Sequence, residues 1–245
     1  MPTHLESADA TRTPPFETED LRKNLVDFFD LSVNDPVTGT PTKIGNFKWG
    51  VYAFYDYDGE PIYVGQTNEQ LRTRIRRHLT NQRTDAVAMS VLDPFEVLEI
   101  EVWPLPQFQG TPRDPHAKAN LDALEYAIYQ RALNDSKFGV VLNEKDPPAP
   151  SVAVSIPKSY RKRVVSDQVH SIRSHPDFRI ARRALVVARL AQVISERKVQ
   201  GGLRRVLLAQ AKRLQWLAER RYEALGGAIS VESETNHTDS SEDLG

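Results

Sequence analysis

The alternation of apolar and polar residues in the first third of the chain predicts a β-hairpin that leads into a helix. Residues 51–56 and 62–64 are two short runs of β-type residues, and Asp58 and Gly59 between them form a turn signal. The following helix is predicted to begin near Asn68, whose side chain can cap the first turn. Its buried stripe recurs every four residues, at Leu71, Ile75 and Leu79.

Three more segments are predicted around this hairpin. An amphipathic helix begins at Glu17 and ends near Leu31, residues 34–46 form a loop punctuated by Pro and Gly, and a third strand spans residues 95–105. The prediction is therefore an α/β domain with a small three-stranded sheet flanked by helices. The apolar stripe of the first helix is Leu21, Leu25, Phe28 and Phe29.

A long helix is predicted over residues 116–133, and Glu125 lies inside its apolar stripe. A carboxylate on a buried face costs on the order of several kcal/mol unless it is paired or binds a cation, so this position needs a reason. On the residues alone, the reason is an ion pair with an arginine of the preceding helix or a solvated edge of the stripe. The stripe itself is Ala117, Leu121, Leu124, Ile128 and Ala132.

Beyond a proline-rich spacer at residues 146–150, the chain is predicted to be helical from Ser159 onward. A break falls at His175 and Pro176, and a turn at Gly201 and Gly202 predicts an antiparallel pair of helices. Basic residues far outnumber acidic ones over this C-terminal extension, residues 158–227. Two interpretations stand side by side: the arginines hold a phosphate backbone, or they face solvent while the helices pack on the rest of the chain or on a second subunit.

Composition sets the outer limits of these predictions. The 245 residues are 40% hydrophobic and 27% charged with a net charge of −1, which is ordinary for a soluble globular protein. No apolar run approaches the roughly 20 residues that span a bilayer, and no secretory signal is recognised, so we expect a cytoplasmic protein without membrane contact. The absence of cysteine excludes disulfides and a thiolate nucleophile. Residues 1–16 and the acidic tail 228–245 are predicted to be disordered.

Two tripeptides in the hairpin resemble a known motif. Gly50-Val51-Tyr52 and Tyr63-Val64-Gly65 are similar to the Gly-Ile-Tyr and Tyr-Ile-Gly tripeptides of the GIY-YIG nuclease superfamily, with valine in place of isoleucine. An arginine-rich helix follows them, as in that family, and the resemblance covers residues 47–146, the expected nuclease domain. The preceding helix, residues 17–46 with its loop, and the histidine four residues after Arg74 are most similar to the type II restriction endonucleases of this fold.

The resemblance implies a catalytic set and one divalent ion per site, magnesium or manganese. Glu125 would hold the ion, and Arg74 would contact the phosphate. Tyr52 would take the proton from water, although a phenol with a pKa of about 10 needs nearby positive charge for that role. The implied catalytic set is Tyr52, Tyr63, Arg74, His78, Glu125 and Asn143.

Within this set, Tyr63 and His78 would orient the water or relay its proton, and Asn143 would fix the backbone or a neighbouring side chain by hydrogen bonds. The expected function is a metal-dependent DNA endonuclease in restriction or phage defence, with DNA as the partner and a homodimer through or with the C-terminal helices. A structure-specific or repair nuclease is the next hypothesis. The hypothesis from another class is a non-catalytic nucleic-acid-binding protein that retains the fold.

Overall fold

The computed structural model describes residues 16–80, 91–110, 113–196 and 201–228. The predicted disordered ends therefore lie outside the described residues, apart from Phe16 and Ala228.

Four antiparallel strands form the main sheet, in the order β4-β3-β5-β6. The strands are β3 (Gly50–Tyr55), β4 (Pro61–Thr67), β5 (Glu99–Pro104) and β6 (Tyr160–Arg163). The first three are the predicted strands, and β3 lies in the middle with β4 at one edge. The hairpin places Tyr52 directly opposite Gly65.

The prediction of a three-stranded sheet is wrong by one strand. Residues from Ser159 were expected to be helical, but β6 pairs with β5 at the other edge of the sheet. The guanidinium of Arg161 lies 3.6 Å from the ring centroid of Tyr55 and forms an ion pair with Glu99. These contacts come from residues far away in the sequence, so local helix propensity does not decide this segment.

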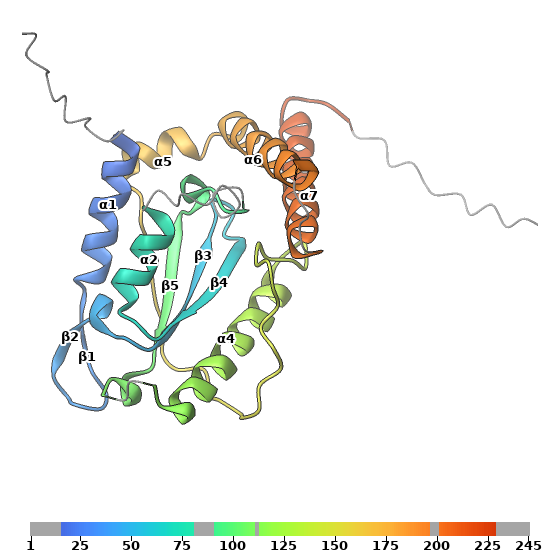
Figure 1. Cartoon of the computed structure of the whole chain (residues 1–245). Coiled ribbons are helices and arrows are strands. Elements are labelled where there is room, and N and C mark those ends of the chain that lie inside the picture. The colour runs from blue at the N-terminus through green and yellow to red at the C-terminus, as the bar shows by residue number, and fades with distance from the viewer. Residues whose placement is uncertain (1–15, 81–90, 111–112, 197–200, 229–245) are drawn as a thin grey trace, which may run out of the picture.

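Helices cover both faces of the sheet (Figure 1). Helices α1 (Phe16–Phe29) and α2 (Leu71–Leu79) lie on one face, and α4 (Pro115–Asp135) lies on the other. The helix α2 begins three residues later than predicted, and its N-cap is Gln70 without a side-chain hydrogen bond, so the predicted Asn68 cap is wrong. Instead, the Leu71 N–H donates to the Phe47 carbonyl oxygen at 2.9 Å.

The two faces of β3 contribute to separate hydrophobic clusters. Tyr52 and Phe54 pack with the apolar residues of α1 and α2, whereas Val51 and Ala53 pack with α4. Strand alternation produces this division, because successive side chains point to opposite faces. The predicted stripes of α1, α2 and α4 are all buried, as expected from their spacing.

The segment before β3 is more regular than the predicted loop. Strands β1 (Ser32–Asn34) and β2 (Pro41–Lys43) form a small hairpin, and the 3-10 turn η1 (Ile44–Asn46) follows it. Two further 3-10 turns, η2 (Pro94–Glu96) and η3 (Pro106–Phe108), flank β5.

Three helices form the C-terminal extension: α5 (Asp167–Arg173), α6 (Pro176–Glu196) and α7 (Gly201–Ala224). Helices α6 and α7 pack side by side, and Arg221 near the end of α7 bonds Asp177 at the start of α6, so the pair is antiparallel. Gly201 and Gly202 belong to the first turn of α7, which corrects the predicted turn at these residues.

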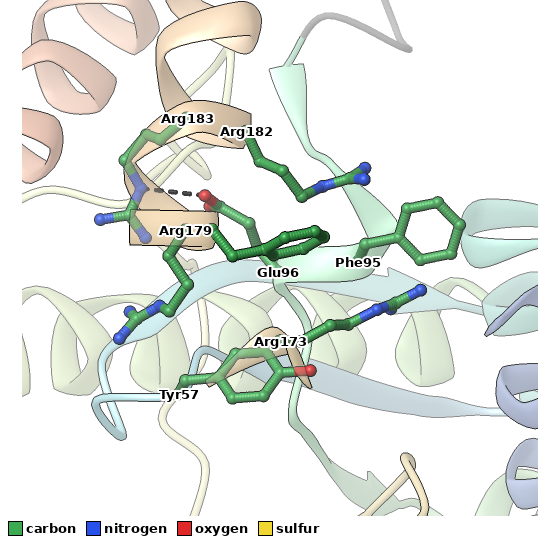
Figure 2. A pocket seen from close by; sticks show the side chains of 8 residues that line it. Tyr57, Phe95, Glu96, Arg173, Arg179, Arg182 and Arg183 are labelled. Atoms are coloured by element: carbon green, nitrogen blue, oxygen red, sulfur yellow. Dashed lines mark hydrogen bonds and ion pairs between the residues drawn. The ribbon is translucent and has the colours of Figure 1, made fainter. Parts of the chain in front are cut away.

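The extension packs on the sheet domain through apolar residues and buried ion pairs. Leu190, Ile194 and Val206 belong to the same hydrophobic cluster as Tyr52. Helices α6 and α7 also contribute arginines that face the turn of the β3–β4 hairpin and the segment before β5. Figure 2 shows the small pocket lined by Tyr57, Phe95, Glu96, Arg173, Phe178, Arg179, Arg182 and Arg183.

Three arginines of the extension are fully enclosed, and the first of them, Arg173 on α5, forms an ion pair with Glu17 of α1 at 2.9 Å. Arg183 is 1% exposed and contacts Glu96 at 2.9 Å and Asp56 at 3.4 Å, and Arg213 is 1% exposed and contacts Asp56 at 2.5 Å. For Arg183 and Arg213, the structure therefore favours the interpretation that the extension packs on the rest of the chain. No helix within the described ranges is long and apolar enough to cross a membrane.

Candidate active site

The two motif tyrosines lie beside each other on the face of the hairpin that α2 covers. The rings of Tyr52 and Tyr63 stack with their centroids 6.2 Å apart. Gly65 lies opposite Tyr52, and a Cβ atom there would come within 2.7 Å of the Tyr52 Cζ and Oη atoms. Glycine is therefore needed at this position because the phenol of Tyr52 fills the space of a side chain.

Helix α2 brings His78 against both tyrosines. The Tyr52 hydroxyl and His78 Nδ1 are 3.4 Å apart, a weak hydrogen bond whose donor depends on the histidine tautomer. The imidazole also meets the Tyr63 ring edge to face, with centroids 4.6 Å apart. Tyr52 is fully buried, while Tyr63 and His78 are half-buried, so Tyr63 and His78 are the members of this trio that reach solvent.

Arg74, one turn before His78, supplies the positive charge of this cluster. Burial lowers the pKa of the Arg74 guanidinium, but Tyr52, Tyr63 and Glu69 together outweigh burial and raise this pKa above its ordinary value. Across the described ranges, Arg74 has no carboxylate within 4.0 Å and its buried Nε atom has no hydrogen-bond acceptor. A half-buried cation with a free donor is suited to binding an anionic ligand.

Glu125 on α4 faces the hairpin through Gln66, the residue after the second motif. Gln66 Nε2 donates to Glu125 Oε2 at 2.7 Å and to Asp122 Oδ1 at 2.8 Å. Asp122 also forms an ion pair with Lys118 one turn earlier. One amide group therefore holds two carboxylates close together at the β4 edge of the sheet.

The charge of Glu125 is destabilised in its surroundings. Burial raises the pKa of the Glu125 carboxyl, and the Asp122 carboxylate raises it further, while the Gln66 bond, Lys118 and Arg74 act in the opposite direction. The influence of Arg74 connects Glu125 electrostatically to the tyrosine cluster. A carboxylate in such a position would be stabilised by a cation.

The residues present at Glu125 fit a divalent cation with a largely aqueous coordination shell. No group of three or more His, Asp or Glu side chains that could hold a metal occurs in the described ranges. Gln66 Oε1 is buried and has no donor in the described parts of the chain, so it can accept a hydrogen bond from a water molecule. Hard cations such as Mg²⁺ prefer oxygen ligands and retain several waters.

Asn143 lies at the outer edge of β4, where its side chain binds the backbone of Val64. The Val64 N–H donates to Asn143 Oδ1 at 3.1 Å, and Asn143 Nδ2 donates to the Val64 carbonyl oxygen at 2.7 Å. Because Val64 separates Tyr63 from Gly65, these bonds fix the strand that carries the second motif. Asn143 itself is buried.

The structure brings the predicted residues together in two connected groups. Tyr52, Tyr63, Arg74 and His78 form the first, Glu125 forms the second through Gln66, and Asn143 supports the strand between them. Sequence reasoning missed Gln66, Asp122 and the steric role of Gly65. Strand alternation offered a signal for Gln66, since it must face α4 if Tyr63 and Gly65 face α2.

Comparison with known proteins gives a match over part of the chain. Residues 48–132 match the family model described as the GIY-YIG catalytic domain. Comparisons with curated proteins and with solved structures gave no match. The matched region holds five of the six predicted site residues, and Asn143 lies beyond it. The match supports the GIY-YIG nuclease superfamily, whose members generally depend on a divalent metal, and it indicates a nuclease, in general an endonuclease acting on nucleic acid.

Proposed function

We propose that this protein is a metal-dependent endonuclease that hydrolyses phosphodiester bonds in DNA. The observation that supports this most directly is the contact of Tyr52, His78 and Arg74 on one side of the hairpin, within electrostatic reach of Glu125. Phosphodiester hydrolysis needs a proton acceptor for water, positive charge at the phosphate and a stabilised leaving oxygen. These side chains offer the first two directly.

The protein groups have separate tasks in this reaction. Arg74 donates from its free Nε atom to a phosphate oxygen, and Tyr52 accepts the proton of the attacking water with Tyr63 and His78 as the route to solvent. A bond forms between the water oxygen and phosphorus while the bond to the 3′ oxygen breaks. The products are a 5′ phosphate and a 3′ hydroxyl after the leaving oxygen takes up a proton.

Glu125 is the residue that would hold the metal, with Gln66 orienting it through Nε2. The free Oε1 atom of Gln66 can accept a hydrogen bond from a water of the coordination shell. When bound, Mg²⁺ or Mn²⁺ supplies positive charge to the phosphate and the leaving oxygen.

A cleavage assay with matched variants tests the proposal. We expect the purified chain to nick or cut plasmid DNA with Mg²⁺ and not with chelator. Glu125→Gln and Tyr52→Phe should each abolish cleavage and leave DNA affinity unchanged, whereas Asp135→Asn, an exposed position on the same helix α4, should cut normally. Unchanged cutting by either site variant would refute the assignment of these residues.

Complete burial of Tyr52 favours a second candidate, a nucleic-acid-binding protein that retains this fold without catalysis. A phenol that water cannot reach does not act as a base. The same assay separates the candidates, because such a binder would shift DNA in a salt-dependent way with intact strands at every Mg²⁺ concentration.

The restriction or phage-defence role is the finer part of the proposal. The helix α1 ahead of β3 and the contact of His78 with both tyrosines support it. Mapping the cleaved ends on defined DNA substrates tests it, because a restriction enzyme cuts at one short sequence. A structure-specific or repair nuclease would instead cut at junctions, flaps or lesions in any sequence.

A further inference from the structure

The segment after α4 adds hydrogen bonds to the free edge of the catalytic hairpin. Strand β4 is the edge strand of the sheet, and the Leu142 N–H donates to the Ile62 carbonyl oxygen at 2.8 Å. The side chain of Asn143 then makes both bonds that a neighbouring peptide would make to Val64. The position of this segment therefore controls the strand between Tyr63 and Gly65.

Helix α7 of the C-terminal extension holds this segment from outside. Arg205 Nη1 lies 2.7 Å from Asp146 Oδ2, and Arg205 Nη2 donates to the carbonyl oxygens of Asn143 and Glu144 at 3.3 and 3.4 Å. Gly202, one turn earlier, lies so close to Glu144 that a Cβ atom there would be 1.9 Å from the Glu144 carbonyl oxygen. The first turn of α7 therefore rests directly on the loop that follows Asn143.

We propose that Arg205 is a positioning residue of the active site, which holds Asn143 on the edge of β4 and so keeps Tyr63 and Gly65 in place against Tyr52. The claim that this matters for cleavage rests on the proposed nuclease function. The side chains of Arg205 and Asp146 are 38% and 55% exposed, and exposed ion pairs contribute only about 0.2–1 kcal/mol to stability. Arg205 therefore acts mainly through its geometry, because its one planar guanidinium group contacts a carboxylate and two carbonyl oxygens.

The competing interpretation of a half-exposed arginine in a DNA enzyme is a phosphate contact. The positioning role and the phosphate contact predict different results for Arg205→Lys. A lysine keeps the positive charge that a phosphate contact needs, but its single nitrogen does not span Asp146 and the two carbonyl groups. Arg204 provides the matched control, because it is an exposed arginine on the same turn of α7.

The first experiment measures amide hydrogen exchange at Val64, whose N–H is bonded to Asn143, and needs no catalysis. We expect exchange to accelerate by at least about tenfold in Arg205→Ala and in Arg205→Lys, with the melting temperature nearly unchanged, because only a local opening is favoured. Arg204→Ala should exchange at the wild-type rate. Unchanged exchange at Val64 in Arg205→Ala overturns the proposal even if the wild-type protein cuts no DNA and the proposed function fails.

The second experiment measures the single-turnover cleavage rate at saturating protein, with DNA affinity measured separately in chelator. We expect Arg205→Ala and Arg205→Lys to slow cleavage by about 10- to 100-fold, because displaced catalytic groups lose rate rather than binding. Affinity and its salt dependence should stay at wild-type values. A wild-type rate at saturation with weaker binding in Arg205→Ala, restored in Arg205→Lys, would identify a phosphate contact and overturn the proposal.

Discussion

Charged residues beside the two ends of the β3–β4 hairpin are neutralised to different degrees. At the turn end, Asp56 contacts Arg213 at 2.5 Å and Asp58 accepts two hydrogen bonds from Arg179. At the site end, Arg74 has no carboxylate within 4.0 Å in the described ranges. Arginines at the turn end are thus paired with carboxylates, whereas the arginine at the site end remains available to bind a ligand.

This difference shows that the arginine content of a segment does not reveal its use. The C-terminal extension has a larger excess of basic residues than α2, yet its buried arginines are paired with carboxylates of the hairpin, of η2 and of α1. The candidate phosphate contact is an arginine of the short helix α2. The buried arginines of the extension differ from Arg74 in having a carboxylate nearby in the fold. Those carboxylates lie far away in the sequence, so the sequence of the segment does not reveal the pairing.

The largest expected effect is a loss of stability when a buried ion pair at the turn end of the hairpin is broken. Arg183→Met removes the partner of Glu96, which is 4% exposed, so a carboxylate remains buried without its counter-charge. We expect a loss of about 3–5 kcal/mol in the free energy of unfolding and a melting temperature lower by about 5–15 °C. Thermal unfolding followed by circular dichroism measures this.

Arg189→Met is the control, because Arg189 is exposed on the same helix α6. Adding Glu96→Gln to Arg183→Met should recover part of the lost stability, since the unpaired charge is then removed. Equal melting temperatures for Arg183→Met and Arg189→Met would show that the buried pairs at the turn end do not support the fold.

The next effect falls on catalysis at the open end. Arg74→Ala should slow cleavage by about 10²- to 10³-fold, the usual loss for one donor to a developing negative charge, with little change in stability because Arg74 has no paired carboxylate. Single-turnover cleavage and thermal unfolding are measured on the same preparation. Arg76→Ala, an exposed position on α2, should cut at the wild-type rate, and an equally slow Arg76→Ala would assign the effect to general charge.

Local periodicity was sufficient for the elements that surround the site. The spacing of Leu121, Leu124 and Ile128 placed Glu125 inside the stripe of α4 that packs on the sheet. The strand β6 could not be predicted in this way, because its residues are extended only when β5 offers an edge.

The same limit applies to the supporting residues of the site. Gln66 and Glu125 are 59 positions apart, and Val64 and Asn143 are 79 apart, so each bond depends on the packing of α4 or of the following segment on β4. The spacing showed only that Glu125 lies inside an apolar stripe, and the roles of Glu125 and Asn143 came from the resemblance to the GIY-YIG superfamily. Their actual partners follow from the tertiary structure.

At the site end, the charge of Glu125 should lower the free energy of unfolding, and a neutral side chain at this position should remove that cost. The pKa of Glu125 is raised by burial, so its contribution favours folding below the ordinary pKa and is lost as pH rises through the raised value. Without metal at pH 7, Glu125→Gln should therefore melt about 1–3 °C higher than wild type. Near pH 4 the two proteins should converge. Mg²⁺ should raise the melting temperature of the wild type but not that of Glu125→Gln. An equal rise in both proteins would mean that the ion binds elsewhere.

The smallest expected effect has the opposite sign and belongs to the neutralised end. Burial alone would raise the pKa of Asp58, but the hydrogen bonds and charge of Arg179, with the charges of Arg183 and Lys137, together outweigh burial and hold this pKa below its ordinary value. The stability that Asp58 contributes is therefore present above the ordinary pKa of about 3.9 and is lost as pH falls through the lowered value. At pH 7 the melting temperature of Asp58→Asn should be below that of the wild type, and it should fall less steeply between about pH 4 and 2. The melting temperature of Asp27→Asn, a variant at an exposed position on α1, should follow the wild-type curve. Parallel curves for Asp58→Asn and wild type across that range would mean that Arg179 does not stabilise the turn through charge.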